Sequence, residues 1–167
     1  RDLGQSGMHW VCWGSPYDEL EWIRSDNHDG ARIATAHLIE RGCKSIACIG
    51  SVDSLQRQFS ERFDGYADAM GAANLTPRLV AIEPDLPREE QGRRAARALL
   101  DSGEPCDGVF AVCDEIALGA LRAFSEAGIH VPQDIALIGF DGIRASAHAM
   151  PPLSTVQPDF AAAGAML

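Results

Sequence analysis

The chain has 167 residues, a formal net charge of −10 and a hydrophobic fraction of 46%. This composition is that of a globular protein with one core or two small lobes, and it excludes a globally disordered chain. The sequence holds no apolar run of the roughly 18 residues that a membrane span needs. The acidic balance argues against nucleic-acid binding by this segment, because phosphate contacts need clustered Lys or Arg.

Short apolar runs alternate with amphipathic segments, which predicts parallel strands flanked by helices. In the first half we expect strands over 10–13, 22–24 and 45–49. A helix over about 29–41 is expected to follow the capping residues Asp26 and Asn27 and to end at Gly42. A second helix over about 58–73 has its apolar side chains at helical spacing on one face, which indicates a helix packed against a core.

The second half continues the same alternation. Strands are predicted over 79–82, 109–112, 135–138 and 154–156. Helices are predicted over 88–100, over 116–127 and from residue 160 onward. The stretch 145–153 shows little periodicity, and the alanine-rich end stops inside a predicted helix, so the chain is interpreted as part of a longer protein.

Polar residues stand where several predicted strands end, which is where open parallel sheets bind ligands. They are Ser15, Asp26, Asn27, Asp29, Ser51, Asp53, Asp114 and Asp141, with the aromatic Trp13 beside them and Arg62 in the helix after the strand 45–49. Carboxylates accept hydrogen bonds from hydroxyls and arginine donates to oxygens, so this set suits a neutral, hydroxyl-rich ligand better than a phosphate. Structural roles stay open, because the same residues serve as helix caps, turn residues or surface ion pairs.

The cysteines and histidines predict neither a disulfide framework nor a metal site. The cysteines are odd in number, five, and irregularly spaced, and three of them lie in apolar runs, which favours free thiols and a reducing cytosol. The five histidines have no metal-ligand spacing. Nucleophile elbows, dinucleotide fingerprints and Walker loops are missing from the sequence, so we expect no cofactor and no enzymatic activity.

Several phrases, in order and over nearly the whole chain, resemble the effector-binding core of the LacI/GalR family of bacterial transcription regulators. They are residues 26–31 leading to 37–42, the phrase Arg62-Phe63-Asp64-Gly65-Tyr66, and residues 113–121, 126–141 and 152–156. The resemblance implies a two-lobed, periplasmic-binding-protein-like α/β fold with parallel sheets flanked by helices. A sugar or similar small metabolite would bind between the lobes.

The resemblance also implies a division of the chain. Residues 1–42 would be the later part of the first lobe, 43–141 the second lobe, and 142–167 the return crossover and the start of the last first-lobe elements. The DNA-binding helix-turn-helix of the family would lie upstream, outside this sequence. A cytoplasmic homodimer that binds operator DNA through that upstream domain is expected.

Four positions match effector-contacting positions of the family. Arg62 is similar to the ligand-clamping arginine, and Asp114 resembles an aspartate that accepts from ligand hydroxyls. Asp29 matches a first-lobe position that faces the effector, and Gln58 matches a polar pocket position. These four residues are the predicted ligand contacts.

Two other function classes compete with the regulator. A periplasmic sugar-binding protein of a transporter would have the same lobes, although the scattered cysteines and the phrase Val131-Pro132-Gln133-Asp134 favour the regulator. A small doubly wound enzyme is the third hypothesis, and it is disfavoured because the sequence shows no nucleophile–base pair or cofactor loop.

Overall fold

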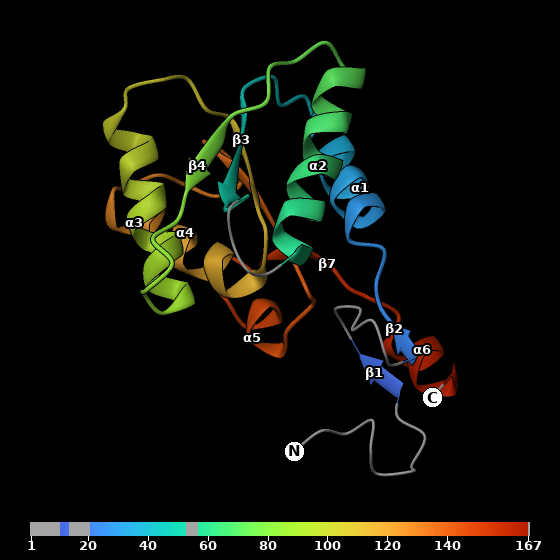
Figure 1. Ribbon diagram of the computed structural model, residues 1–167. Coiled ribbons are helices and arrows are strands. Elements are labelled where there is room, and N and C mark those ends of the chain that lie inside the picture. Colours follow the sequence, from blue (N-terminus) through green and yellow to red (C-terminus); the bar gives the residue numbers. More distant parts are fainter. Residues whose placement is uncertain (1–10, 14–20, 53–56, 167) are drawn as a thin grey trace. The chain divides into compact units, whose positions relative to one another are not determined.

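The computed structural model describes residues 11–13, 21–52 and 57–166, with the side chains of 11–13 and of 21 and 22 left out (Figure 1). The chain divides into two compact units. The small unit consists of Arg1–Asp26 and Pro158–Leu167, and the large unit of Asn27–Gln157. None of the helices in the described residues has the length and apolar character of a membrane span.

The small unit contains two short strands and one helix. Strand β1 (Val11–Trp13) pairs in parallel with β2 (Glu21–Ile23), with Cys12 opposite Trp22. Helix α6 spans Phe160–Met166. The two strands and the terminal helix occur where the sequence pattern predicts them, within one residue at each bound described.

A five-stranded parallel sheet forms the centre of the large unit. Its strands are β3 (Ile46–Gly50), β4 (Leu79–Ala81), β5 (Gly108–Ala111), β6 (Ala136–Phe140) and β7 (Ser154–Val156). The order across the sheet is β4-β3-β5-β6-β7, and every pairing is parallel. The central strands β3 and β5 are buried along their whole length, as strands covered on both faces must be.

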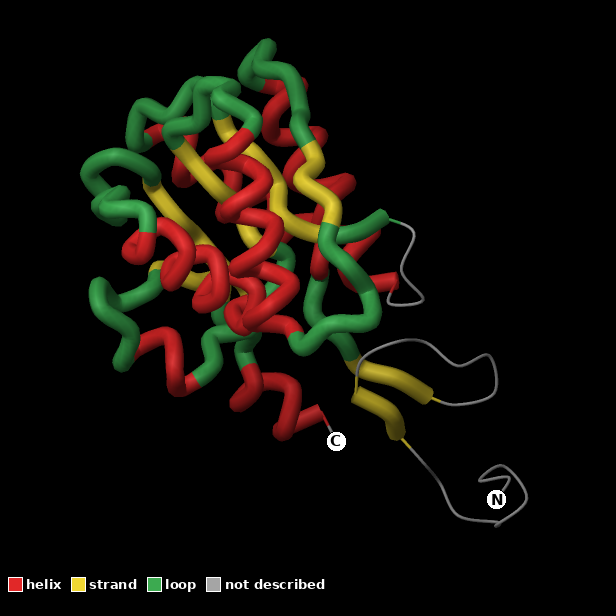
Figure 2. Tube along the Cα trace, turned by 90° about the vertical axis from the view of Figure 1, so that its left-hand side faces the viewer, coloured by secondary structure: helices red, strands yellow, loops and turns green. Residues whose placement is uncertain are grey.

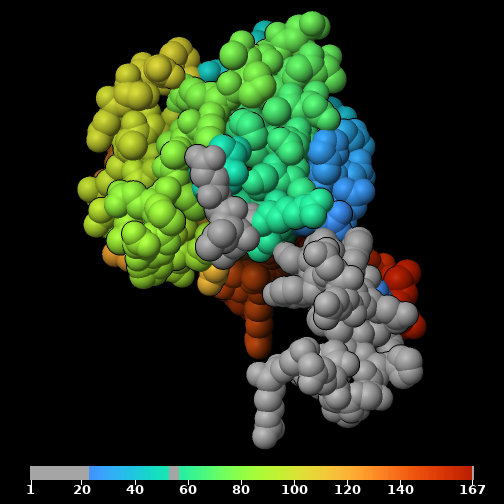
Figure 3. Space-filling model, in the orientation of Figure 1, coloured from blue at the N-terminus to red at the C-terminus, as the bar shows by residue number. Residues whose placement is uncertain are grey.

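Helices lie on both sides of the strands (Figure 2). Helix α1 (Asn27–Glu40) packs against α2 (Arg57–Ala72), and α3 (Arg88–Asp101) packs against α4 (Asp114–Glu126). The two pairs form different parts of the surface in Figure 3. Helix α3 is yellow-green and lies on one side of the face, and α2 in green and α1 in blue lie on the other. A short helix, α5 (Arg144–Ala147), overlaps the stretch 145–153, which shows little periodicity in the sequence.

Glycine allows each helix pair to cross at backbone distance. A Cβ atom on Gly65 of α2 would lie 2.0 Å from the carbonyl oxygen of His28 in α1. A Cβ atom on Gly92 of α3 would lie 1.9 Å from the carbonyl oxygen of Ile116 in α4. Any larger residue would push the helices apart, so these glycines set the distance between helices.

The core consists of the apolar faces of these helices and the buried strands. Tyr66, Phe110, Phe124 and Phe140 are its largest fully buried side chains. Tyr66 satisfies its hydroxyl there by donating to the carbonyl of Ile46 at 2.8 Å and accepting from the amide of Arg78 at 2.8 Å. Burial of four aromatic rings supplies much of the hydrophobic stabilisation of the large unit.

Helix α1 and the chain up to Gln157 belong to the large unit. The family resemblance assigns residues 27–42 to the first lobe, whereas the structure includes α1 in the large unit. Helix α1 contacts α2, β5, β6 and β7, and Gly30 on α1 leaves room for the ring of Phe140, which a Cβ atom would meet at 2.7 Å. At the other end the large unit continues to Gln157 instead of ending at residue 141.

Candidate functional site

The connection order of the sheet creates a position for a ligand in the large unit. The chain runs from β3 outward to β4, then crosses back to β5 on the other side of β3. In a parallel sheet this reversal separates the loops that follow the two central strands, and it leaves a crevice at their carboxyl ends. Polar groups at the ends of β3 and β5 are therefore the first candidates for a binding site.

Arg62, on α2, contacts the chain at the carboxyl end of β5. Its side chain is buried, and its three nitrogen atoms are all held by neighbours from different elements. The Nε–H donates to Oδ1 of Asn27 at 3.0 Å, one terminal nitrogen donates to the carbonyl of Val112 at 2.7 Å, and the other pairs with Asp141 at 2.9 Å. A guanidinium has five N–H donors, so two of them remain for a further acceptor.

Asp141 follows the last residue of β6 and supplies the negative partner of Arg62. Its side chain is 37% exposed, whereas that of Arg62 is 8% exposed. Its backbone has a φ of +109°, a region that residues other than glycine rarely adopt. Backbone strain of this kind concentrates at functional sites, and here the strained residue carries the carboxylate that pairs with Arg62.

Burial dominates the protonation behaviour of this pair. It raises the pKa of Asp141, opposed by Arg62 and reinforced by the negative charges of Asp114 and Glu115. It also lowers the pKa of Arg62, opposed mainly by Asp141, although a guanidinium stays protonated at neutral pH. The nearby thiol of Cys113 has its pKa raised to about 11 by burial, so it is a neutral group there.

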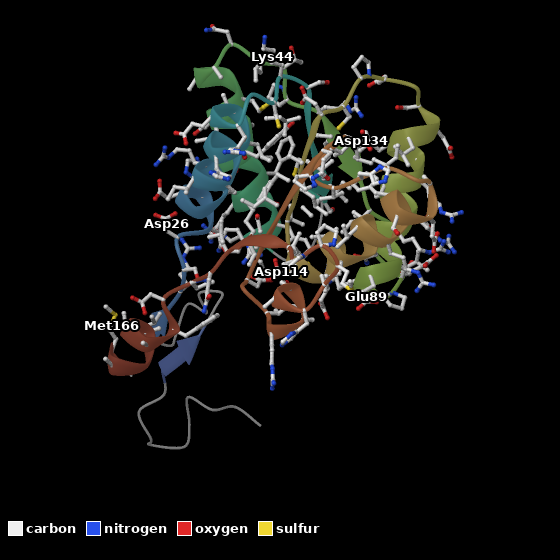
Figure 4. All side chains as sticks on the ribbon, turned by 180° about the vertical axis from the view of Figure 1, so that it is seen from behind. Asp26, Lys44, Glu89, Asp114, Asp134 and Met166 are labelled. Carbon is white, nitrogen blue, oxygen red and sulfur yellow. The ribbon has the colours of Figure 1, made fainter. Side chains whose placement is uncertain are left out.

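Asp114 lies at the same end of the sheet but has no exposed surface. Figure 4 labels it near α5, at the opposite end of the sheet from Lys44 and Asp134. One oxygen, Oδ1, accepts from the hydroxyl of Thr155 at 2.6 Å, and Oδ2 accepts from the amide of Ile143 at 2.9 Å and the hydroxyl of Ser146 at 2.8 Å. A ligand hydroxyl would have to displace these donors, so this geometry does not offer Asp114 as a direct contact.

The other two predicted contacts lie on the helices α1 and α2. Asp29 is in the first turn of α1, where its half-exposed carboxylate pairs with Arg32 at 2.7 Å. It belongs to the large unit. Gln58 is the second residue of α2 and is half-buried. The structure thus joins Arg62 and Asp114 through Asp141 and its loop.

Two members of the network were present in the sequence as strand-end residues but were not predicted as ligand contacts. The sequence suggests a helix cap at Asn27. In the structure its side-chain oxygen accepts a hydrogen bond from Arg62, and its side-chain nitrogen donates to Glu61 at 3.0 Å. Asp141 has the look of a turn residue. Its position between the end of a buried strand and Gly142 was the available signal, because Asp is one of the few residues that tolerate a positive φ.

A hollow of about 450 Å³ lies at the opposite end of the sheet, before the strands β5, β6 and β7 begin. Its walls include His37, Arg41, Asp107 and Asp134. None of the four predicted ligand contacts lines it. Within the described residues, no group of three or more His, Cys, Asp and Glu side chains could hold a metal ion.

Comparison with protein families gives a match over residues 35–167 to the periplasmic binding protein-like domain. The chain belongs to this family. Similar proteins of known kind include transcriptional repressors. The transcriptional repressor PurR of Actinobacillus pleuropneumoniae serotype 3 is 37% identical over 145 residues, which are 86% of this chain and 43% of the repressor.

Solved structures of LacI-family regulators have the same fold. A structure described as a LacI-family transcriptional regulator from Sanguibacter keddieii is 32% identical, with a TM-score of 0.77 over 87% of this chain and 55% of that one. The complex of the regulator CelR with cellobiose is also 32% identical, with a TM-score of 0.75 over 89% of this chain and 46% of that one. The resemblance to LacI-type regulators and the predicted fold class are therefore confirmed, and the chain spans about half the length of these relatives.

Proposed function

We propose that this chain is the effector-sensing part of a LacI-type transcriptional regulator, and that it binds a sugar or a similar hydroxyl-rich metabolite. The observation that carries the proposal is the Arg62–Asp141 pair at the carboxyl ends of β5 and β6, beside the switch point of the sheet. Membership of the periplasmic binding protein-like family and similarity to LacI-type regulators support it over the transporter alternative.

The chemistry of the pair favours a neutral polyol. Arg62 has two N–H donors beyond those used by its protein neighbours, and the exposed part of the Asp141 carboxylate accepts from hydroxyls. A phosphate would meet the negative charges of Asp141, Asp114 and Glu115 at the same edge, which disfavours it. CelR, a similar protein, forms a complex with cellobiose.

In this proposal Arg62 and Asp141 contact the effector, and Gln58 and Asp29 are further candidate contacts. Asp114 acts indirectly, since its oxygens are occupied by protein donors. The effector would bias the protein between two conformations by binding one of them more tightly. No catalytic step and no cofactor belongs to this function.

The remaining partners follow from the kind of protein. The regulator would bind operator DNA through an upstream helix-turn-helix domain, since the relatives that this chain matches are DNA-binding repressors and are about twice its length. We expect it to act as a homodimer in the cytoplasm, where its DNA target is. Operator binding that responds to the effector is the output that the proposal predicts.

The experiment is a thermal-shift screen of the full-length protein against monosaccharides, disaccharides and nucleobases, followed by operator-binding measurements with each compound that stabilises it. A bound ligand at 100 times its dissociation constant adds about 2.7 kcal/mol, which is a clear shift of the melting temperature. The proposal predicts that at least one sugar raises this temperature and changes operator affinity. A screen in which only nucleobases act would replace the sugar by a planar heterocycle, and one in which no compound acts would overturn the proposal.

A matched pair of variants ties the response to the site. Asp141→Asn removes the charge beside Arg62, while Asp134→Asn removes an exposed carboxylate at the other end of the sheet that contacts His130. The proposal predicts loss of the sugar response in the first variant and its retention in the second.

A further inference from the structure

Three consecutive backbone amides hold the segment that presents Asp141. The amide of Asp141 donates to the carbonyl of Val156 at 2.9 Å. The amide of Gly142 donates to the hydroxyl of Thr155 at 3.2 Å, and that of Ile143 donates to Oδ2 of Asp114 at 2.9 Å. Because the φ of Asp141 is unfavourable for an L-residue, the segment needs such outside contacts to keep its shape.

Asp114 is the centre of these contacts. The hydroxyl of Thr155 donates to Asp114 Oδ1 while accepting from Gly142, so one side chain joins the strained segment, β7 and α4. Ser146, the buried residue of α5, donates to the other oxygen. The chain leaves room for this carboxylate at Gly139, where a Cβ atom would lie 2.3 Å from Asp114 Oδ1.

We propose that Asp114 is a positioning residue, which with Thr155 fixes the segment Asp141–Ile143 and thereby sets the Asp141 carboxylate opposite the guanidinium of Arg62. It acts through its bonds to Ile143, Ser146 and Thr155 and does not touch the effector. The consequence for ligand affinity rests on the proposed function. The consequence for the Arg62–Asp141 pair holds with or without a ligand.

The variant Thr155→Val separates positioning from charge. Replacing Asp114 itself would remove a negative charge that raises the pKa of Asp141, so its effect on that carboxyl would have two opposite causes. Valine has nearly the shape of threonine but can neither donate to Asp114 nor accept from Gly142. The charged groups that face Asp141, which are Arg62, Asp114 and Glu115, all stay in place.

The measurement is the pKa of Asp141 by NMR, in full-length protein labelled with ¹³C at the aspartate carboxyl groups. If the segment loosens, the pKa of Asp141 departs from the wild-type value: the weaker pairing with Arg62 raises it, by about one for a tenfold weaker pairing, and loss of burial lowers it. Thr35→Val is the matched control, since Thr35 is also fully buried and its hydroxyl donates to the carbonyl of Ala31, within α1. Thr155→Ser, which keeps the hydroxyl, is expected to restore the wild-type value.

The outcomes separate the positioning role from a merely structural one. A lower melting temperature in Thr155→Val with an unchanged pKa of Asp141 would overturn the proposal. If Thr155→Val does not fold, Ser146→Ala removes a different donor to Asp114, and a smaller shift of the Asp141 pKa is expected. With a sugar found by the screen, Thr155→Val is expected to weaken binding about tenfold and Thr35→Val to leave it unchanged. A shifted pKa of Asp141 in a protein that binds no sugar would support positioning while refuting the proposed function.

Discussion

The guanidinium of Arg62 lies over the ring of Phe140, with its central carbon 3.7 Å from the ring centroid. The next residue, Asp141, pairs with the same guanidinium. Two successive residues at the end of β6 thus hold one cation, Phe140 through its ring face and Asp141 through its carboxylate. This arrangement fixes the direction of the remaining N–H donors of Arg62, which is what a binding site for a rigid sugar ring needs.

Arg62→Ala should destabilise the large unit as well as abolish binding. The change leaves the carbonyl of Val112 and the amide of Asn27 without their donor and Asp141 without its counter-charge. Breaking a buried, hydrogen-bonded pair costs about 3 kcal/mol, toward the low end of the usual range because Asp141 is partly exposed. Urea unfolding measures this loss.

The control for this variant is Arg32→Ala, which removes the partner of Asp29. Both side chains of that pair are about half exposed, at 49% and 48%. Surface pairs of this kind contribute about 0–1 kcal/mol. Equal losses of unfolding free energy in the two arginine variants would contradict the buried role of Arg62.

Most of the fold could be predicted from local sequence pattern, because period-two and helical spacings reflect burial directly. Helix α5 could not, since four residues are too few to show a period, and its position depends on Ser146 bonding to Asp114. The start of the large unit at Asn27 could not be predicted from the sequence either. It depends on α1 packing against α2, which no residue near position 42 reveals.

The site was predicted in part. Arg62 was found from a family phrase, and the structure buries it beside the switch point of the sheet. Asp114 was expected to face a ligand, yet which way a strand-end carboxylate points depends on distant donors such as Thr155, which only the folded chain brings near. Asp141 was visible as a strand-end residue, but its backbone conformation was not.

Two glycines of the same helix should respond oppositely to alanine. Gly65→Ala would place a Cβ atom 2.0 Å from a carbonyl oxygen of α1, so we expect a loss of about 2–3 kcal/mol as the helices separate. Gly71→Ala meets no atom within 4 Å, and we expect it to stabilise α2 by up to about 1 kcal/mol. Thermal unfolding of both variants tests this, and a tolerated Gly65→Ala would show that α1 and α2 do not cross so closely.

The ion pairs of α3 should make the stability of the protein depend on pH in the acid range. Hydrogen bonds from Arg93 and Arg94 lower the pKa of Glu90 from 4.5 to about 2. A carboxyl with a lowered folded-state pKa contributes stability above pH 4.5, and this contribution is lost as the pH falls toward 2. The variant Glu90→Gln should therefore show a shallower decline of stability between pH 4.5 and 2, measured by urea unfolding. An identical decline in both proteins would refute the assignment.

The thiols should differ in reactivity with iodoacetamide. Burial raises the pKa of Cys43, Cys48, Cys106 and Cys113, and Cys48 has no exposed surface. Among these four, which are free thiols in the structure, Cys106 is the most accessible. Mass spectrometry of the native protein at pH 8 should find Cys106 alkylated first and Cys48 last. The reverse order would mean that β3 opens more readily than the loop before β5.

The most direct test of the account is a crystal structure of the full-length protein with a sugar that stabilises it. The account predicts a sugar oxygen within hydrogen-bonding distance of the Arg62 guanidinium and a sugar hydroxyl donating to Asp141, with Asp114 still bonded to Thr155. A sugar bound elsewhere on the molecule, with the Arg62–Asp141 pair untouched, would contradict it.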